Sequence, residues 1–416
     1  MRLAVAKEGR NPGLRSLPRN VWAVTATSFL TDISSEMVVN LIPIFLAEVL
    51  GVRTDIIGLI EGIAETTASL LKVISGWLSD RLGQRKWLTV AGYSLSTLAK
   101  PFLYLATGWV GVLVVRFADR TGKGIRTAPR DALVADSIDA EHRGLAFGLH
   151  RAGDTAGAAL GVLGALFVVW LAQGTSAELS RATFQAAVLI SIIPAVLAVL
   201  ALAAGVREVP VAGRQPARLP SLSLAGLDTR FRGFLLIALL FTLGNSSDAF
   251  LILRAKERGL SVVGVMGMLV AFNLVYALVS GPAGSLSDRI GRRRLIVSGW
   301  LVYGLIYLGF AVAATAWQAV ALFAVYGVYY GLAEGTARAL VADLVLPEQR
   351  GTAYGVYNAA IGVAAFPASL VAGILWQGVG GWMGFGPSAP FFFGAALATV
   401  AAGCLAWALP AVSRKG

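Results

Sequence analysis

The sequence predicts an all-α membrane protein with twelve transmembrane helices in two pseudo-symmetric six-helix bundles. Three observations lead to this prediction. Of the 416 residues, 56% are hydrophobic and only 14% are charged, whereas soluble domains carry about 25% charged residues. Apolar runs long enough to cross a bilayer, which takes roughly 20 residues, recur along the chain. The two halves of the chain also repeat each other.

Twelve apolar runs are candidate spans. They cover 20–48, 55–79, 87–107, 109–135, 143–172 and 183–206 in the first half, and 232–253, 261–287, 295–314, 317–344, 351–376 and 389–410 in the second. A polar, proline-containing linker separates the two sets. The expected organisation is a tail over 1–19, a bundle over 20–206, a linker over 207–231, a bundle over 232–410 and a tail over 411–416.

Basic residues set the expected orientation, because membrane proteins concentrate Lys and Arg in cytoplasmic loops. The segments on the side of the two termini hold 21 Lys and Arg, and the opposite loops hold 5. This bias also explains the net charge of +12 without nucleic acid as a partner. We therefore expect a multi-pass protein of a bacterial plasma or inner membrane, with both termini in the cytoplasm. The basic cluster Arg254–Arg258 is the exception.

Short segments of the first half recur in the second in the same order. Gly76–Lys86 (GWLSDRLGQRK) matches Gly284–Arg294, Ala132–Asp136 (ALVAD) matches Ala339–Asp343, Glu141–Gly144 matches Glu348–Gly351, and Ser34–Glu36 is similar to Ser246–Asp248. Matches at nearly one spacing predict a duplicated architecture. Two six-helix halves related by an axis along the membrane normal are typical of transporters, which hold their solute between the halves.

The segment Gly76–Lys86 resembles the signature loop G-x-L-x-D-R-x-G-x-R-K of the major facilitator superfamily. Span count, linker and repeat extend the resemblance over nearly the whole chain. It implies secondary active transport by alternating access, in which the halves rock about a central site, and no enzymatic activity. The fifth span has Gly153, Gly157 and Gly161 in place of the G-P-x-x-G-G pattern of many drug–proton antiporters.

The signature loop provides a candidate cytoplasmic gate. An acidic residue at a helix end, Asp80, can accept from free backbone N–H groups and pair with basic neighbours. The resemblance implies that Asp80 braces the cytoplasmic side when the carrier opens outward. The candidate gate residues are Gly76, Asp80, Arg81, Gly83, Arg85, Asp136, Asp288 and Arg289. In the plainer interpretation, the basic residues serve only topology.

Ionisable residues within the spans are the strongest functional signal, because a charge at bilayer depth is costly unless it is paired or hydrated. Basic residues of the fourth span recur on one helical face, which cannot contact lipid. The substrate-binding candidates are Arg116, Arg120, Lys123, Arg126, Asn245, Asp248, Glu334 and Arg338. The cationic stripe favours a solute with an anionic group. Lys100 and Asp119 belong to the same set of intramembrane charges.

A proton gradient is the expected driving force, since burial and neighbouring charges let carboxylates exchange protons as one side opens. The proton-coupling candidates are Asp32, Glu36, Glu61, Glu65, Asp154 and His150. In the plainer interpretation, most of these residues belong to a self-neutralising network of ion pairs.

Other functions are excluded or stay open. One cysteine and two histidines give no metal-ligand set, and TGKG at Thr121–Gly124 lacks the spacing of a phosphate loop, so we expect no cofactor. An alternative is a proton-driven efflux pump for amphipathic drugs or metabolites. A non-transporting sensor and a membrane enzyme are further alternatives. The expected functional unit is a monomer in the lipid bilayer, with a small solute and protons as partners.

Overall fold

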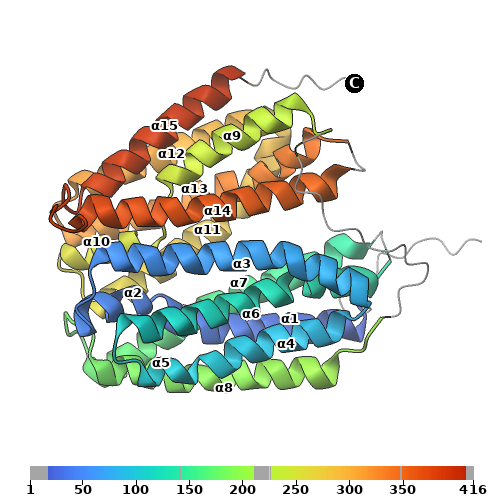
Figure 1. Cartoon of the computed structure of the whole chain (residues 1–416), viewed down its shortest axis with the longest axis horizontal. Coiled ribbons are helices and arrows are strands. Elements are labelled where there is room, and N and C mark those ends of the chain that lie inside the picture. The colour runs from blue at the N-terminus through green and yellow to red at the C-terminus, as the bar shows by residue number, and fades with distance from the viewer. Residues whose placement is uncertain (1–16, 140–141, 210–223, 225, 347–348, 409–416) are drawn as a thin grey trace, which may run out of the picture.

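The computed structural model describes residues 17–139, 142–209, 224, 226–346 and 349–408, and the side chains of a few residues within these ranges, Asp288 among them, lie outside the description. The first bundle contains α1 (Arg19–Val39), α2 (Ile42–Ile44), the π-helix η2 (Phe45–Val49), α3 (Thr54–Leu82), α4 (Arg85–Ala99), α5 (Pro101–Leu105), α6 (Trp109–Asp136), α7 (Arg143–Gln173) and α8 (Arg181–Gly205). The axes of the long helices run roughly parallel to one another (Figure 1).

The second bundle repeats this plan. It contains α9 (Thr229–Gly244), α10 (Ala249–Glu257), α11 (Val262–Ile290), α12 (Arg292–Val312), α13 (Ala316–Asp343), α14 (Arg350–Gln377) and α15 (Ala389–Ala408). We call the end of the molecule where α1 begins and α15 ends the terminal end, and the other the opposite end. The predicted tails fall largely outside the described residues, as does most of the predicted linker.

The prediction of twelve spans in two bundles is confirmed. Nine helical segments of the described chain are long and apolar enough by themselves to cross a membrane. The other three spans are α3, α4 with α5, and α6. Helices α3 and α6 carry many of the intramembrane charges. Helix α4 has only 15 residues before the helix is interrupted at Lys100. The charges and the helix break make these three spans less uniformly apolar than the other nine, although all twelve are recognisable as candidate spans in the sequence.

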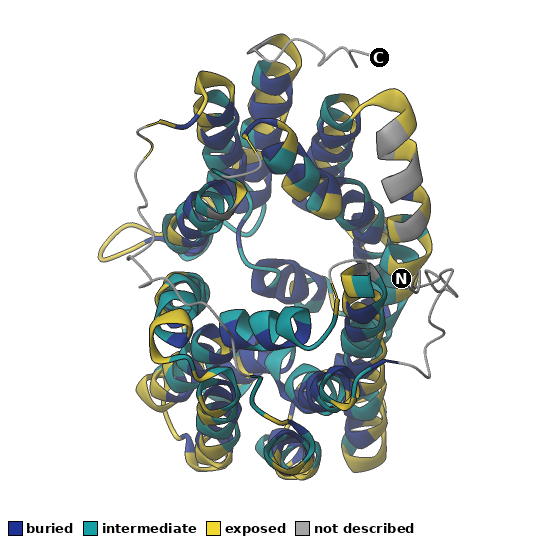
Figure 2. Ribbon diagram, turned by 90° about the vertical axis from the view of Figure 1, so that its right-hand side faces the viewer, coloured by how far each residue is buried: buried dark blue, intermediate teal, exposed yellow. Residues whose placement is uncertain are grey.

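The outer surface is that of a membrane protein. Exposed residues gather on the outward faces of both bundles (Figure 2), and many of them are large and apolar. Trp407 is 90% exposed, Trp317 74% and Leu305 68%. In water such a surface would drive association, whereas in a bilayer it contacts the lipid chains.

Three spans are interrupted, which the sequence analysis did not predict. The first breaks after Asn40, the third at Lys100 and the seventh between Asn245 and Asp248. At Lys100 the cause is local, because Pro101 follows and has no N–H to continue the helix. Each break leaves polar backbone groups inside a bundle, where a charged or hydroxyl side chain can reach them.

The bundles meet most closely along α3 and α14, which lie side by side (Figure 1). Small residues permit this contact. A Cβ on Gly58 would lie 2.2 Å from the carbonyl oxygen of Ser369, and a Cβ on Gly362 would lie 2.0 Å from the Cβ of Ser69. The contact at Gly58 lies near the opposite end, and the contact at Gly362 lies near the middle of both helices.

Polar contacts fasten the two bundles at the opposite end. Arg53 donates to the carbonyl oxygens of Gln377 (3.2 Å) and Gly378 (3.1 Å), and the Thr54 N–H donates to Gln377 Oε1 at 2.7 Å. Lys256 also pairs across the junction with a partner in η2, Glu48, at 2.9 Å. The molecule is therefore closed at this end.

The same end accommodates the exceptional basic cluster of the sequence. Arg254 is only 1% exposed and donates to the carbonyl oxygens of Phe310 (3.0 Å) and Ala311 (2.9 Å). It also pairs with Glu257 at 2.6 Å, and Arg258 contacts the same carboxylate at 3.2 Å. These bases hold the fold together and do not report on the orientation of the chain.

Candidate functional site

A cavity of about 760 Å³ lies between the two bundles. We call it the central cavity. The first bundle lines it with α1, α3, α4, α6 and α7, and the second with α11 and α13. Its acidic, basic and histidine lining residues are Asp32, Glu36, Lys72, Lys123, Arg126, Arg130, Asp131, His150, Arg151, Asp154, Glu334 and Arg338. It extends toward the terminal end, where Phe147 and Arg338 line it.

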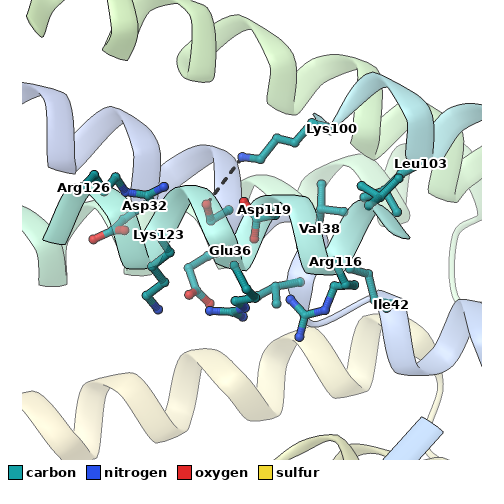
Figure 3. Close-up of a pocket in the computed structure, with 14 residues that line it drawn as sticks. Asp32, Glu36, Val38, Ile42, Lys100, Leu103, Arg116, Asp119, Lys123 and Arg126 are labelled. Carbon is teal, nitrogen blue, oxygen red and sulfur yellow. Dashed lines mark hydrogen bonds between the residues drawn. The ribbon is translucent and has the colours of Figure 1, made fainter. Parts of the chain in front are cut away.

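A smaller pocket of about 110 Å³ lies within the first bundle. We call it the side pocket. Its polar lining residues are Asp32, Ser35, Glu36, Lys100, Arg116, Asp119, Arg120, Lys123 and Arg126. Four of them, Asp32, Glu36, Lys123 and Arg126, line the central cavity as well and so form the mouth between the two spaces. Lys123 and Glu36 point the same way, and Lys100 reaches in from the other side (Figure 3).

The charged face of α6 turns inward because its neighbours pack tightly against it. A Cβ on Gly122 would lie 2.5 Å from the carbonyl oxygen of Gly92 in α4, so only glycine permits this spacing. With the helix held in this orientation, Arg116, Arg120 and Arg126 are buried in the bundle. The stripe predicted from the sequence therefore avoids lipid.

Two of these arginines already have acidic partners on α3. Arg116 pairs with Glu61 at 2.6 Å, and both side chains are almost fully buried. One helical turn away, Arg120 contacts Glu65 at 3.5 Å. A buried pair of this kind fixes the positions of its members, because separating them would leave a charge without a partner. Two predicted proton sites and two predicted substrate sites are thus bound to one another.

Other charges of this group have no oppositely charged partner within the described structure. Arg126 donates to Ser96 at 2.6 Å and lies 4.5 Å above the Tyr93 ring. Asp32 and Lys123 form no hydrogen bond or ion pair with another described side chain, and Glu36 accepts only from Asn40, at 2.9 Å. The four charges at the mouth are therefore not held in ion pairs.

The part of the side pocket away from its mouth contains two charged residues that the predicted site omitted. Lys100 is 6% exposed and donates to the hydroxyls of Ser34 and Ser35. The carboxylate of Asp119 has no hydrogen-bond partner among the described residues. Lys100 directly precedes Pro101, and this lysine at a forced helix break was a signal available in the sequence.

The residues predicted in the seventh span lie elsewhere. Asp248 accepts from the hydroxyls of Tyr326 (3.1 Å) and Tyr330 (3.3 Å). Asn245 ends α9. Neither of these two predicted binding residues lines the central cavity or the side pocket. Asp248 is thus one hydrogen bond behind Tyr330, which lines the cavity wall.

The tenth-span pair does line the central cavity and connects the two bundles. Glu334 accepts from Arg338 and from the Tyr276 hydroxyl, both at 3.1 Å. From the first bundle, Arg151 donates to Tyr276 at 3.2 Å and lies 3.8 Å from Glu334.

His150 and Asp154 lie together on the wall of the central cavity that α7 forms. Their Nδ1 and Oδ1 atoms are 3.8 Å apart, and His150 is buried.

The candidate gate forms an ion-pair cluster at the terminal end of the first bundle. Arg85 contacts Asp80 at 3.1 Å and Asp136 at 2.6 Å. Gly83 ends α3 with φ +71°, a conformation that glycine adopts readily. Glu208 accepts from the N–H groups of Arg85 (2.9 Å) and Lys86 (3.0 Å), an anchor that the sequence analysis missed.

The second bundle carries a similar pair at the same loop. Arg292 contacts Asp343 at 2.7 Å; Asp343 is the repeat counterpart of Asp136, whereas Arg292 is the counterpart of Gln84 and not of Arg85. Gly76 packs against Ala128, and the Arg81 guanidinium lies 5.3 Å from the Trp77 ring. Arg289 is exposed, and the side chain of Asp288 is outside the described structure. Each of these ion-pair clusters lies within its own bundle, and neither crosses the junction between the bundles.

Two duplicated six-span bundles around a charged cavity define a solute carrier of the major facilitator type. The family model described as Major Facilitator Superfamily matches residues 24–268 and 234–415. The chain belongs to this family of transporters, as the signature loop predicted.

Relatives carry related descriptions. The chain is 35% identical, over 94% of its length and 95% of the relative's, to an uncharacterised transporter of this type from Methanocaldococcus jannaschii. Over 58% of each chain it is 29% identical to a probable 4-methylmuconolactone transporter of Cupriavidus pinatubonensis.

Solved structures share the fold. A POT family transporter in complex with 5-aminolevulinic acid matches with a TM-score of 0.77 and 12% identity, over 94% of this chain and 96% of that one. A bacterial homologue of the human lysosomal transporter Spinster, in an inward-facing and unoccupied conformation, matches with a TM-score of 0.70 and 17% identity, over 94% and 95%.

Proposed function

We propose that the protein is a proton-coupled secondary active transporter that moves a small solute with an anionic group by alternating access. The observation that carries this proposal is the central cavity, which both bundles line with charged side chains. A space formed by two rigid bodies can open to either side when they rock, and the side pocket opens into this space through its mouth. A monomer contains the whole cavity.

The conformation described above is then the inward-facing one. This assignment rests on the closed opposite end, on the extension of the cavity toward the terminal end and on the bias of Lys and Arg toward that end. It places both termini in the cytoplasm of a bacterial plasma or inner membrane, with the bundles at 20–206 and 232–410. In the outward-facing state, the cluster around Asp80 would exchange its partners within the bundle for partners across the junction.

The anionic group of the solute is assigned to the mouth of the side pocket. Lys123 and Arg126 supply positive charge there that no carboxylate neutralises directly. Arg116 and Arg120 are held by Glu61 and Glu65, so their role is to fix α6 against α3 beside the pocket.

Proton coupling is assigned first to Asp32. Its carboxylate has no partner in the described structure, and it lines both spaces, so it can meet water and solute in turn. Glu36 is the second candidate. Glu61, Glu65, Asp154 and His150 are bound to other groups or lie against them, and they would take part only if those contacts separated.

The test is transport by purified protein in proteoliposomes with an imposed pH gradient. We expect gradient-driven flux in the wild type, loss of pH dependence with Asp32→Asn, and loss of flux of an anionic solute with Lys123→Met. Arg230→Met is the control, because Arg230 is an exposed base that lies outside the signature loop and lines neither cavity. Flux that ignores the pH gradient in all these proteins would disprove proton coupling.

A second candidate is export of amphipathic drugs. Over 33% of each chain, the protein is 33% identical to a Bacillus subtilis protein named multidrug resistance protein 2, and Tyr276 and Tyr330 give the cavity an aromatic wall. The charged lining favours the first candidate. Competition between a cationic dye and the anionic solute for flux would favour the second.

A further inference from the structure

The mouth of the side pocket consists of two short rows of opposite charge. Asp32 and Glu36 are one turn apart on α1, and Lys123 and Arg126 are nearly one turn apart on α6. Residues with these spacings lie on the same face of a helix. Each row therefore presents two like charges to the same space.

The two rows are not in direct contact. No ion pair joins an acid of α1 to a base of α6 among the described residues, so the rows act on each other only at a distance, although nearby Arg116 and Arg120 both have acidic partners. The pocket also contains a second unpaired couple, Lys100 and Asp119. A low-dielectric site with equal numbers of free acids and free bases is completed by water or by a ligand that carries both charges.

Hydrogen-bonding capacity in the pocket is also unused. The Nε atoms of Arg116 and Arg120 are buried and have no partner, and both side chains line the pocket. Burying such donors without a partner costs free energy, so an acceptor that enters the pocket would be bound favourably. A solute group or ordered water can supply it.

Size limits what can enter. The side pocket measures about 110 Å³, whereas one water molecule occupies about 30 Å³ of the liquid. The pocket therefore holds a group of a few non-hydrogen atoms, and the rest of a larger solute must stay in the central cavity of about 760 Å³.

We propose that the side pocket binds a zwitterionic head group, an ammonium and a carboxylate carried on the same carbon atom. The carboxylate lies between Lys123 and Arg126, the ammonium lies between Asp32 and Glu36, and the body of the solute extends into the central cavity. This inference rests on the proposed transport function and narrows its solute class from anionic to zwitterionic.

A single charge satisfies the mouth less well. A purely anionic group would place another negative charge beside Asp32 and Glu36, and a purely cationic group would lie against Lys123 and Arg126. Like charges that lie close together at the mouth of the pocket repel each other and so oppose binding. Only a ligand with both signs gives each row a partner of the opposite charge.

The experiment measures binding to the purified full-length protein in lipid nanodiscs, by calorimetry and thermal shift. The probes are free α-amino acids with side chains of graded size and polarity. Each is compared with its N-acetyl derivative, which lacks the ammonium, and with its methyl ester, which lacks the carboxylate. We expect at least one free amino acid to bind, and either cap to weaken binding by about tenfold to a hundredfold, as expected for a lost charge-assisted hydrogen bond.

Two variants assign the two ends. Asp32→Asn should weaken binding of the free amino acid and should not weaken binding of its N-acetyl derivative, from which it removes a repelling charge. Lys123→Met should weaken binding of the free form and should not weaken binding of the methyl ester, for the same reason. Arg230→Met serves as the folded control with wild-type affinity. Equal affinity for capped and free forms, or no binding by any free amino acid of the panel, overturns the inference.

Failure of this inference can be told apart from failure of the transport proposal. Proton-driven flux of a solute without an ammonium, unchanged by Asp32→Asn, removes the zwitterionic head group and keeps the carrier. Gradient-driven flux of an amino acid that binds in the panel, reduced by both variants, supports both proposals. Absence of gradient-driven flux for every solute that binds contradicts the carrier itself.

Discussion

The two bundles share one architecture and differ in chemistry. The inside of the first bundle carries the acids and bases that line the side pocket. The corresponding interior of the second bundle is aromatic, with the rings of Tyr303 and Tyr307 4.1 Å apart and those of Phe241 and Trp300 4.5 Å apart. A duplicated scaffold has thus kept its helix packing while the charges collected in one copy.

This difference suggests a division of labour. A close-packed aromatic cluster is rigid and makes an apolar or weakly polar wall. The charged bundle can change its interactions when a proton or a solute arrives. We therefore expect mutations in the first bundle to alter coupling and solute binding, and matched mutations in the second to alter mainly stability. Each prediction below can break or sharpen this comparison.

The largest effect is expected from breaking the buried pair of the first bundle. In Arg116→Met, Glu61 would be left charged and buried, and the loss of one member of such a pair costs about 3–5 kcal/mol. The thermal unfolding midpoint in detergent should fall strongly and recover in part in Arg116→Met with Glu61→Gln.

The matched control for that experiment is Arg120→Met. Its partner Glu65 is 46% exposed, so water can replace the arginine and the loss should be much smaller. Equal losses in the two variants would mean that the buried pair is not the feature that distinguishes this bundle.

The next effect concerns the seam between the bundles. In Gly362→Ala the added Cβ would lie 2.0 Å from the Cβ of Ser69, and overpacking of this kind costs about 1–3 kcal/mol. Because the clash exists only when α3 and α14 are in contact, it should disfavour closure of the opposite end. Labelling of a cysteine placed near that end should become faster.

Gly355→Ala on the same helix is the control, because its Cβ would meet nothing within 4 Å. It should label like the wild type. Equal labelling of both variants and the wild type would show that the seam does not determine which end is closed.

The architecture could be predicted from the sequence because it follows from repeated, chain-wide signals. Twelve apolar runs and a recurring loop motif need no knowledge of individual contacts. The inward orientation of the charged stripe of α6 was also predictable, since a charged helical face must avoid lipid. The family assignment followed from one well-specified motif, Gly76–Lys86.

The details of the site were not predictable, because they depend on pairings between distant helices. Nothing in the sequence distinguishes Arg116, bound to Glu61, from Lys123, which is free. Asp248 looked like a binding residue because it is an acid within a span, yet two tyrosines 78 and 82 positions away shield it. The break at Lys100 was visible as Lys-Pro, but its hydroxyl partners on α1 were not.

A smaller effect is expected at the ion pair that joins the bundles. Lys256 and Glu48 are 9% and 21% exposed, so solvent screens the pair in part and its coupling energy should be about 1 kcal/mol. A double-mutant cycle with Lys256→Met and Glu48→Gln, read out as the fraction of protein closed at the opposite end, measures it. Additive effects would mean that the pair does not contribute to closure.

The smallest effect should come from the second bundle. Tyr326→Phe removes one of the two hydroxyls that donate to Asp248, and the loss of one such hydrogen bond costs about 0.5–1.5 kcal/mol. Because the aromatic wall is retained, thermal stability should fall slightly while the pH dependence of flux stays that of the wild type. A change in that pH dependence would make Asp248 a coupling residue and would end the division of labour between the bundles, because a proton site would then lie in each copy of the repeat.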